Sequence, residues 1–323
     1  MSCFLADLEL LTSTSHRTAM LFPMKPFFLL FSLSALSLAG CAQTQTSAQG
    51  VVDKASGNAR IGREEARALL RQSNDKAAQG DYPSAMALRW QMLGIRGANA
   101  DSIGFLTGGA IQSLALGNIE TIASRLDAPA CRDFAAQLER ADASAPTYAQ
   151  LLEKKQADAL KDFDSLTKNP ADWPKTVAQL GFTGQDAQTL LQTTPEQIRQ
   201  NIALIYESAQ AAAQKPYGTA PVPVAVDPYS QTFAAPNRLE RFIWTRLKTE
   251  RLLVVAALSR RADRLEGKAP SPLPADPFGV GPFKEASGVI YSIGPDERDD
   301  GGKVGAGVRA RDDYKGDLPA PSL

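Results

Sequence analysis

An apolar run near the start of the chain limits what the rest of it can fold into. The run extends from Phe27 to Leu38, with a lysine just before it and two small residues just after it. A helix needs roughly 20 apolar residues to cross a bilayer, so this run is short for a membrane span and has the length of the apolar core of an export signal. We therefore expect residues 1–40 to be a leader, with the signal in residues 24–40, and the folded protein to begin after them.

The run ends in Leu38-Ala39-Gly40-Cys41, which resembles the lipobox of bacterial lipoproteins. The resemblance implies that a peptidase cuts before Cys41, that lipid is attached to its thiol and its freed amine, and that acyl chains hold the protein on a membrane. By the sorting rule of that family, Ala42 implies the outer membrane, with the protein facing the periplasm. A cleaved secretory signal with a chance cysteine and an uncleaved anchor are the alternatives. Residues 1–23 have no role in this interpretation, and Met24 is the better start.

The composition of the mature chain excludes several classes of function. The totals of 35 basic and 35 acidic residues each lose two with the leader, so the mature chain is neutral and has no electrostatic case for binding nucleic acid. The only histidine, His16, also lies in the leader, which excludes Ser-His-Asp or Cys-His catalysis and histidine-containing zinc sites. With Cys41 lipidated, Cys131 has no cysteine to pair with, and we expect it to be a small, partly buried helix residue.

A flexible tether and then a helical region follow the lipobox. Residues 41–59 are mostly Gln, Thr, Ser, Ala and Gly, which predicts the tether. From residue 60 to 214 the apolar residues recur at helical spacing. A hairpin near residues 77–93 resembles a tetratricopeptide repeat in its Gly80-Asp81-Tyr82 junction, but the pattern does not recur clearly, so a generic bundle of helical hairpins is expected. Later helices are expected at Cys131–Ala141, Tyr148–Thr167, Pro174–Leu180, Gln185–Gln192 and Pro195–Gln214, the last one capped by Thr194.

The C-terminal part of the chain predicts a different kind of unit. Repeated prolines in residues 215–237 predict an extended linker and a domain boundary. A long helix is expected from Leu239 to about Glu266, with an apolar stripe on one face. Strands at Phe283–Glu285 and Val289–Ile293 predict a β-hairpin. The expected fold is therefore mainly α, with a helical hairpin bundle first and then a small α+β unit in residues 238–323 that ends in an acidic tail.

Two motifs in this unit resemble the C-terminal half of the major pseudopilin of type II secretion systems. They are Leu273-Pro274-Ala275-Asp276-Pro277-Phe278-Gly279 and Tyr291-Ser292-Ile293-Gly294-Pro295-Asp296, and they follow a long helix as in that family. They also look like the tail of uncharacterised bacterial envelope proteins. The chain departs from pseudopilins in having a lipobox and a late helix, so the resemblance implies a small αβ module and not assembly into a fibre.

The same resemblance implies a calcium site in the acidic tail. Pseudopilins bind calcium through aspartates after the second motif; Asp296 matches the first of these, and Asp312 and Asp313 are the best counterparts of the later pair. Calcium takes six to eight oxygen ligands from carboxylates and carbonyls held in a loop. Basic residues between these aspartates weaken the match, and a solvated acidic tail is the alternative.

Three functions remain open from the sequence. The leading interpretation is a lipid-anchored envelope protein with a periplasmic helical binding or scaffold role and no catalysis, whose partners are the membrane and another envelope protein. The C-terminal resemblance favours an accessory subunit of a secretion or pilus machine. The third is an enzyme that uses carboxylates alone, because Glu207-Ser208 is similar to the catalytic Glu-Ser of lytic transglycosylases. A downstream segment that this last family needs is missing.

Overall fold

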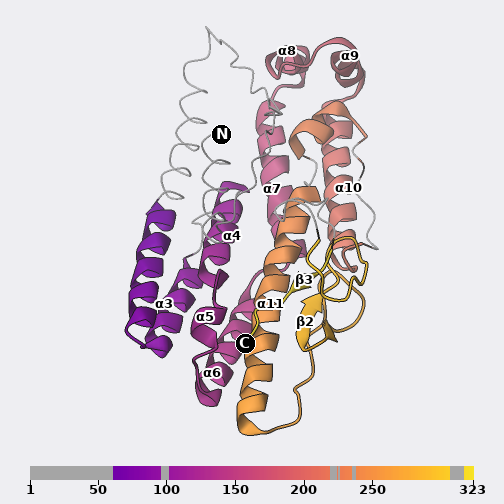
Figure 1. Ribbon diagram of the computed structural model, residues 1–323. Helices are drawn as coiled ribbons and strands as arrows, with labels where there is room; N and C mark the ends of the chain where they lie inside the picture. Colours follow the sequence, from indigo (N-terminus) through magenta and orange to yellow (C-terminus); the bar gives the residue numbers. More distant parts are fainter. Residues whose placement is uncertain (1–60, 96–101, 219–223, 225, 235–237, 306–315) are drawn as a thin grey trace, which may run out of the picture. The chain divides into compact units, whose positions relative to one another are not determined.

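A computed structural model of the chain describes residues 61–95, 102–218, 224, 226–234, 238–305 and 316–323. It is mainly helical, with a small three-stranded antiparallel sheet near the C-terminus (Figure 1), and this confirms the expected fold class. The leader, the lipobox and the tether lie outside the described residues. Two compact units are distinguished by their internal contacts: Met1–Arg71 with Gln91–Ala115, and Gln72–Trp90 with Leu116–Leu323.

The first unit has a small apolar core between three helices. These are the helix over residues 61–78, α3 (Tyr82–Gly94) and α4 (Ser102–Leu116), the first two of which also extend into the second unit. Ala66, Met92 and Ile111 come from the three helices in turn, and each is at most 1% exposed. Contacts between small and large apolar side chains therefore hold these helices together.

A tight turn joins the helix over residues 61–78 to α3. Gly80 has a φ of +79°, a left-handed conformation that ends a helix without the strain a side chain would add. Asp81 then accepts a hydrogen bond from the first turn of α3. Arg89 of α3 is 5% exposed, and its Nη1 donates to the Gly117 carbonyl at 3.0 Å. The helical hairpin expected here is confirmed, whereas its likeness to a tetratricopeptide repeat stays a prediction.

The five helices expected between residues 131 and 214 are present, and their capping residues explain where they begin. Thr194 and Gln197 form a reciprocal capping box at the start of the last helix, which confirms the predicted cap. The first of the five begins three residues earlier than expected, because Asp127 caps it by accepting the Ala130 N–H. The elements are α5 (Glu120–Ala123), α6 (Ala128–Ser144), α7 (Tyr148–Leu166), η1 (Pro170–Asp172), α8 (Trp173–Gln179), α9 (Gly184–Gln192) and α10 (Pro195–Ala213).

The pair α7 and α10 has its own core, which includes a residue from the proline-rich region. Tyr229 is 4% exposed, and its ring lies 4.9 Å from that of Phe163 on α7. Asp227 holds the segment that contains Tyr229 in place, because the Oδ2 of Asp227 accepts a hydrogen bond from Asn201 of α10 at 2.9 Å. A π-helical turn, η2 (Ser230–Ala234), follows directly. This part of the proline-rich region is therefore packed on α7 and α10.

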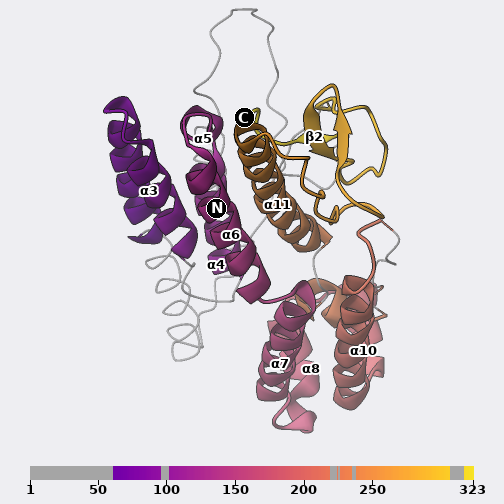
Figure 2. The same cartoon turned by 90° about the horizontal axis from the view of Figure 1, so that it is seen from below.

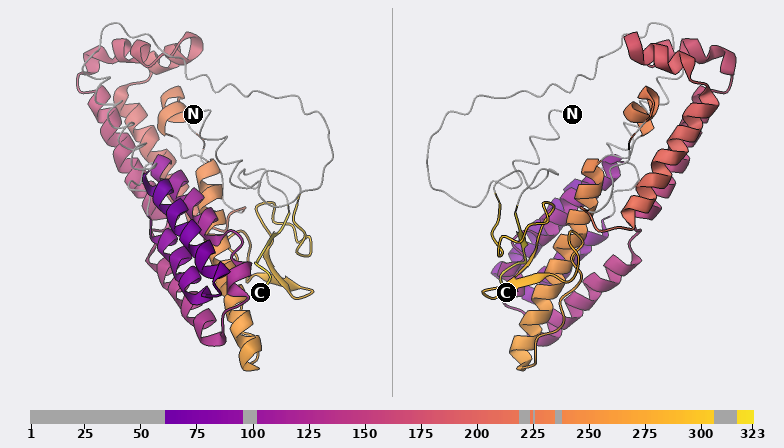
Figure 3. Two further views of the ribbon diagram at one scale, coloured as in Figure 1. Left: turned by 60° about the vertical axis from the view of Figure 1, so that its left-hand side comes forward. Right: turned by 90° about the vertical axis from the view of Figure 1, so that its right-hand side faces the viewer.

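The long helix α11 (Arg238–Glu266) passes through the middle of the second unit. Each of residues 253–258 is between 0% and 5% exposed, so the helix is buried all round at this point. It is buried because α6 lies beside it (Figure 2) and the strands of the sheet pack against it as well (Figure 3). Leu239 and Leu265 lie at its two ends and are 36% and 52% exposed. The apolar stripe expected for this helix is therefore buried in its middle and not at its ends.

Charged side chains of α11 connect it to the helices around it. Lys155 Nζ of α7 lies 2.6 Å from both carboxylate oxygens of Glu240. Arg251 Nη2 lies 2.6 Å from the Oδ1 of Asp142 at the end of α6. Arg241 donates to backbone carbonyls at the C-terminal end of α10, where the helix dipole favours a cation. These charges cross-link α11 to α6, α7 and α10.

The sheet has the strand order β1-β2-β3. The expected hairpin is formed by β1 (Lys284–Ala286) and β2 (Val289–Ser292). Ser287 and Gly288 between them have φ angles of +51° and +79°, as a type I′ turn requires. The third strand, β3 (Leu318–Pro319), pairs with β2 and was not expected from the sequence. It is two residues long, which leaves too little alternation for a pattern to be recognised.

The sheet and the turns around it share one apolar core with α11. Phe242 of α11 is fully buried, and its ring lies 6.1 Å from that of Phe278. Phe283 and Leu318 close the same core from the start of β1 and from β3, at 2% and 5% exposure. A two-stranded hairpin is marginal by itself, so this core is what keeps the sheet folded.

Candidate functional site

The two C-terminal motifs meet at the carboxylate of Asp276. This side chain is 6% exposed, and its Oδ1 accepts hydrogen bonds from the Phe278 N–H at 2.9 Å and from the Ser292 hydroxyl at 2.7 Å. Its Oδ2 accepts the Ile293 N–H at 3.0 Å. These three donors replace the water that burial removes from the carboxylate. The aspartate of the first motif therefore joins the turn after α11 to the end of β2.

Three backbone segments cross close to this point, and each crossing needs a glycine. A Cβ on Gly294, whose φ is +70°, would collide with the Gly316 carbonyl. A Cβ on Gly316 would in turn collide with the backbone of Gly305. Gly305 and Gly316 therefore lie against each other, and the ten residues between them in sequence lie outside the described residues.

The acidic residues after the second motif accept hydrogen bonds from nearby donors. Asp296 accepts the Gly316 N–H at 3.1 Å, and Asp317, which is fully buried, accepts the Gly302 N–H at 2.7 Å. Asp299 accepts the Tyr291 hydroxyl at 2.8 Å. That bond lowers the pKa of Asp299, while burial and the same carboxylate raise the pKa of Tyr291 to about 12. These contacts shape the tail around β2.

The expected calcium ligands are only partly within the described residues. Asp296 is described, whereas Asp312 and Asp313 lie outside. Among the residues that the structure describes, no group of three or more histidine, cysteine, aspartate or glutamate side chains is placed to hold a metal ion. The calcium site formed by Asp296, Asp312 and Asp313 therefore stays a prediction.

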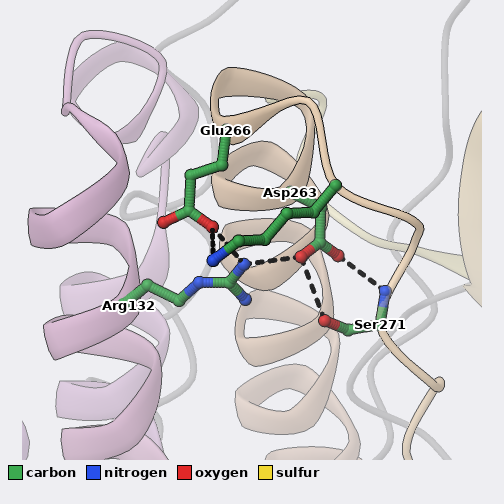
Figure 4. Close-up of polar contacts among 5 residues, drawn as sticks. Arg132, Asp263, Glu266 and Ser271 are labelled. Carbon is green, nitrogen blue, oxygen red and sulfur yellow. Dashed lines mark hydrogen bonds and ion pairs between the residues drawn. The ribbon is translucent and has the colours of Figure 1, made fainter.

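A second polar cluster joins the far end of α11 to α6 (Figure 4). Arg132 Nη2 lies 2.6 Å from Asp263 Oδ1 and 2.8 Å from Glu266 Oε2. Lys268 adds a second cation to Glu266 at 3.0 Å. The Ser271 N–H and hydroxyl donate to the two oxygens of Asp263 at 2.6 and 3.1 Å. The cluster therefore fixes both α6 and the segment after α11.

The partners of these two carboxylates decide their protonation. Burial opposes the charge of Asp263, but the hydrogen bonds from Ser271 and Arg132 outweigh it, and the pKa of Asp263 is lowered. The pKa of Glu266 is also lowered, first by the hydrogen bond from Arg132 and then by that from Lys268. Both groups therefore bind their partners best when ionised.

The remaining residues singled out from the sequence lie apart from these clusters. Cys131 lies on α6 as expected but is fully buried, not partly, and burial raises the pKa of its thiol. Glu207 and Ser208 are exposed on α10. The proposal of catalysis by Glu207 stays a prediction. Cys41 lies outside the described residues.

The chain was also compared with known proteins. No protein family, curated protein or solved structure matches it. Within the residues that the structure describes, none of the helices combines the length and the apolar character needed to cross a membrane. The resemblances to lipoproteins, pseudopilins and tetratricopeptide repeats therefore depend only on the motifs quoted for them.

The sequence pointed to Asp276 and Ser292 but not to the bond between them, and it gave no sign of the Arg132 cluster. The two motifs mark their residues by type, since Asp-Pro and Ser-x-Gly favour turns. Arg132 and Asp263 are separated by 131 positions. Single charges at helical positions are common, so nothing in either local sequence identifies the partner.

The first prediction concerns the bond between the two motifs. Replacing Asp276 with Ala leaves three donors without an acceptor, two of them buried, so we expect a loss of about 2–4 kcal/mol in the free energy of unfolding. Ser292→Ala should cost about 1 kcal/mol, and the double variant should cost less than the sum because the two side chains share one bond. Urea unfolding measures all three. Asp300→Asn is the matched control, since it removes an exposed charge from the same tail; simple additivity of the two costs would contradict the shared bond.

The second prediction concerns pH. Because the folded-state pKa values of Asp263 and Glu266 are lowered, their stabilisation is complete above the ordinary values of 3.8 and 4.5 and is lost as the pH falls through the folded-state values. Arg132→Met should therefore lower the Tm by about 2–4 °C at pH 7 and by much less at an acid pH below both folded-state values. Thermal melts at the two pH values measure this. An equal loss at both pH values, or the same loss for the exposed control Arg125→Met, would show that the cluster does not act through these charges.

The third prediction concerns calcium. Since Gly305 and Gly316 touch, replacing residues 306–315 with a Gly-Ser link should leave the fold intact and the Tm almost unchanged. If Asp312 and Asp313 bind calcium with Asp296, a hundredfold excess over Kd stabilises the full chain by about 2.7 kcal/mol. The shortened chain and the Asp312→Ala, Asp313→Ala variant should both lose that gain. A full chain whose melt ignores calcium and a chelator alike would favour the solvated tail.

Proposed function

We propose that this chain is a lipid-anchored envelope protein whose helical body has a binding or scaffold role, without catalysis, on the periplasmic side of the outer membrane. One observation carries the proposal: an apolar run of signal length ends in Leu38-Ala39-Gly40-Cys41 and is followed by a polar, glycine-containing stretch. Its partners are the membrane, through the lipid on Cys41, and a second envelope protein.

The arrangement of buried charges supports a scaffold role. Glu240 and Asp263 are each bound to a cation on another helix, and Asp276 and Asp227 accept hydrogen bonds from neighbouring segments. These buried acids are used to fix elements to one another. Such cross-links make a body that keeps its surfaces in a constant arrangement, as binding a partner protein requires.

The fourth prediction tests the anchor. Cys41→Ser should abolish labelling by palmitate and leave an unprocessed precursor, because the acyl acceptor is gone. Cys131→Ser is the matched control: this thiol is buried on α6, so its loss should leave labelling unchanged. Equal label on the wild type and on Cys41→Ser would rule out the lipobox. Fractionation to the inner membrane would contradict the outer-membrane part alone.

Wild type and Cys41→Ser also test whether the protein binds a second envelope protein. After crosslinking of intact envelopes, the lipidated chain should recover a specific envelope protein, and Cys41→Ser should recover less of it because it is not held at the membrane. Recovery of the same proteins by both chains would contradict a role that depends on the anchor.

An accessory subunit of a secretion or pilus machine is a second candidate. The bond between Asp276 and Ser292 favours it, because the two pseudopilin-like motifs meet in one small unit beside a long helix. The crosslinked protein decides between the candidates: a component of such a machine, lost with Ser292→Ala, would favour the accessory subunit. A partner from elsewhere in the envelope, unaffected by that substitution, would favour the general scaffold.

A further inference from the structure

Three arginines form a line along the helix over residues 61–78. Arg63, Arg67 and Arg71 follow one another at intervals of four residues, so they lie within about 80° around the helix axis. Arg71 is exposed and the other two are half-buried. Ala66 faces the apolar core of the first unit and lies about 100° from Arg67 around the axis. The arginines therefore lie along one flank of the helix, beside its buried face.

This line has a cost for the helix that carries it. Like charges four residues apart destabilise a helix by about 0.2–0.5 kcal/mol for each pair, and the line contains two such pairs. Glu64 stands beside the first two arginines and Asp75 follows Arg71 at the same interval of four residues, so both acids offset part of the repulsion, whereas Glu65 lies about 160° from Arg67 around the axis. Three arginines against these two acids leave a small excess of positive charge on this flank, although the whole chain is neutral. Because repulsion among the arginines destabilises their own helix, we infer that they interact with something outside it.

The residue type and the position both favour one partner. All three cations are arginines, whose guanidinium groups bind phosphate through paired hydrogen bonds. Residues 42–60 connect Cys41 to this helix. If these residues form the flexible tether that their composition predicts, they span roughly 25 Å on average and about 65–70 Å at most. On the anchor proposed above, the arginines are therefore never far from the phosphates of the bilayer.

We propose that Arg63, Arg67 and Arg71 bind the anionic phospholipid headgroups of the membrane that holds the lipid on Cys41, and thereby orient the helix over residues 61–78 on its surface. This inference rests on the proposed function, because the anchor supplies the proximity. Each basic residue near an anionic surface contributes about 1 kcal/mol. With Glu64 and Asp75 set against the three arginines, the ratio of surface-bound to free body should rise about fivefold on anionic lipid.

A fluorescent label next to the line measures this ratio. Ala78 is exposed and lies about 20° from Arg67 around the axis, so Ala78→Cys gives a site for the label, whereas Cys131 is buried. The lipidated full chain is placed in vesicles of phosphatidylcholine, with or without about a third of phosphatidylglycerol, and a quencher is attached to the headgroups. We expect quenching in the anionic vesicles and its reversal by about 0.5 M salt, since salt screens surface charges.

Replacing the three arginines with Gln should abolish the difference between the two kinds of vesicle. The matched control removes as much positive charge from exposed lysines of α7 and α8, by Lys154→Gln, Lys161→Gln and Lys175→Gln, and should keep the difference. Melting curves confirm that both variants fold. If the wild type floats with the vesicles but is quenched equally on both lipids, the arginine inference alone is overturned. The same holds if the lysine control also loses the difference in quenching between the two kinds of vesicle. Wild type that does not float with either vesicle contradicts the anchor itself.

Discussion

The burial of α11 on every side is the constraint on which the second unit depends. Along residues 253–258 the helix has no solvent-facing side, so these six residues are all apolar, and the charged residues of α11 lie before and after this stretch. Those charges still need partners, because an unpaired charge near a core is costly. Lys155, Asp142 and Arg132 supply them from α7 and α6. The need of these charges for partners therefore also determines that α6 and α7 pack next to α11.

Local signals in the sequence were sufficient for most of the elements. Thr194 and Pro195 mark the start of α10, and Ser287-Gly288 is compatible with the tight turn of the hairpin, so these caps and turns can be placed from neighbouring residues alone. The helical pattern predicts a start for α6 that is three residues too late, because the pattern does not include the cap at Asp127. The sequence pattern does not predict the two-residue strand β3, because this short segment can be recognised as a strand only from its pairing with β2.

The polar clusters could be predicted only by residue type. The turn-forming character of Asp276 and Ser292 was visible, but their bond spans 16 positions and depends on how the chain folds back. The Arg132 cluster depends on the packing of α6 on α11, and nothing near either residue encodes it. Pairing between distant charges follows from the tertiary fold, whereas capping follows from the neighbouring residues, and this difference separates what could be predicted from what could not.

The separation of 131 positions between Arg132 and Asp263 has a consequence for how the protein folds. Contacts between residues far apart in sequence form slowly, since a long loop must close before any stabilisation is gained. Throughout that time the apolar side of α6 has no cover, and exposed surface of this kind promotes aggregation. We therefore expect refolding to be slow and sensitive to protein concentration, with the union of α6 and α11 as the late step.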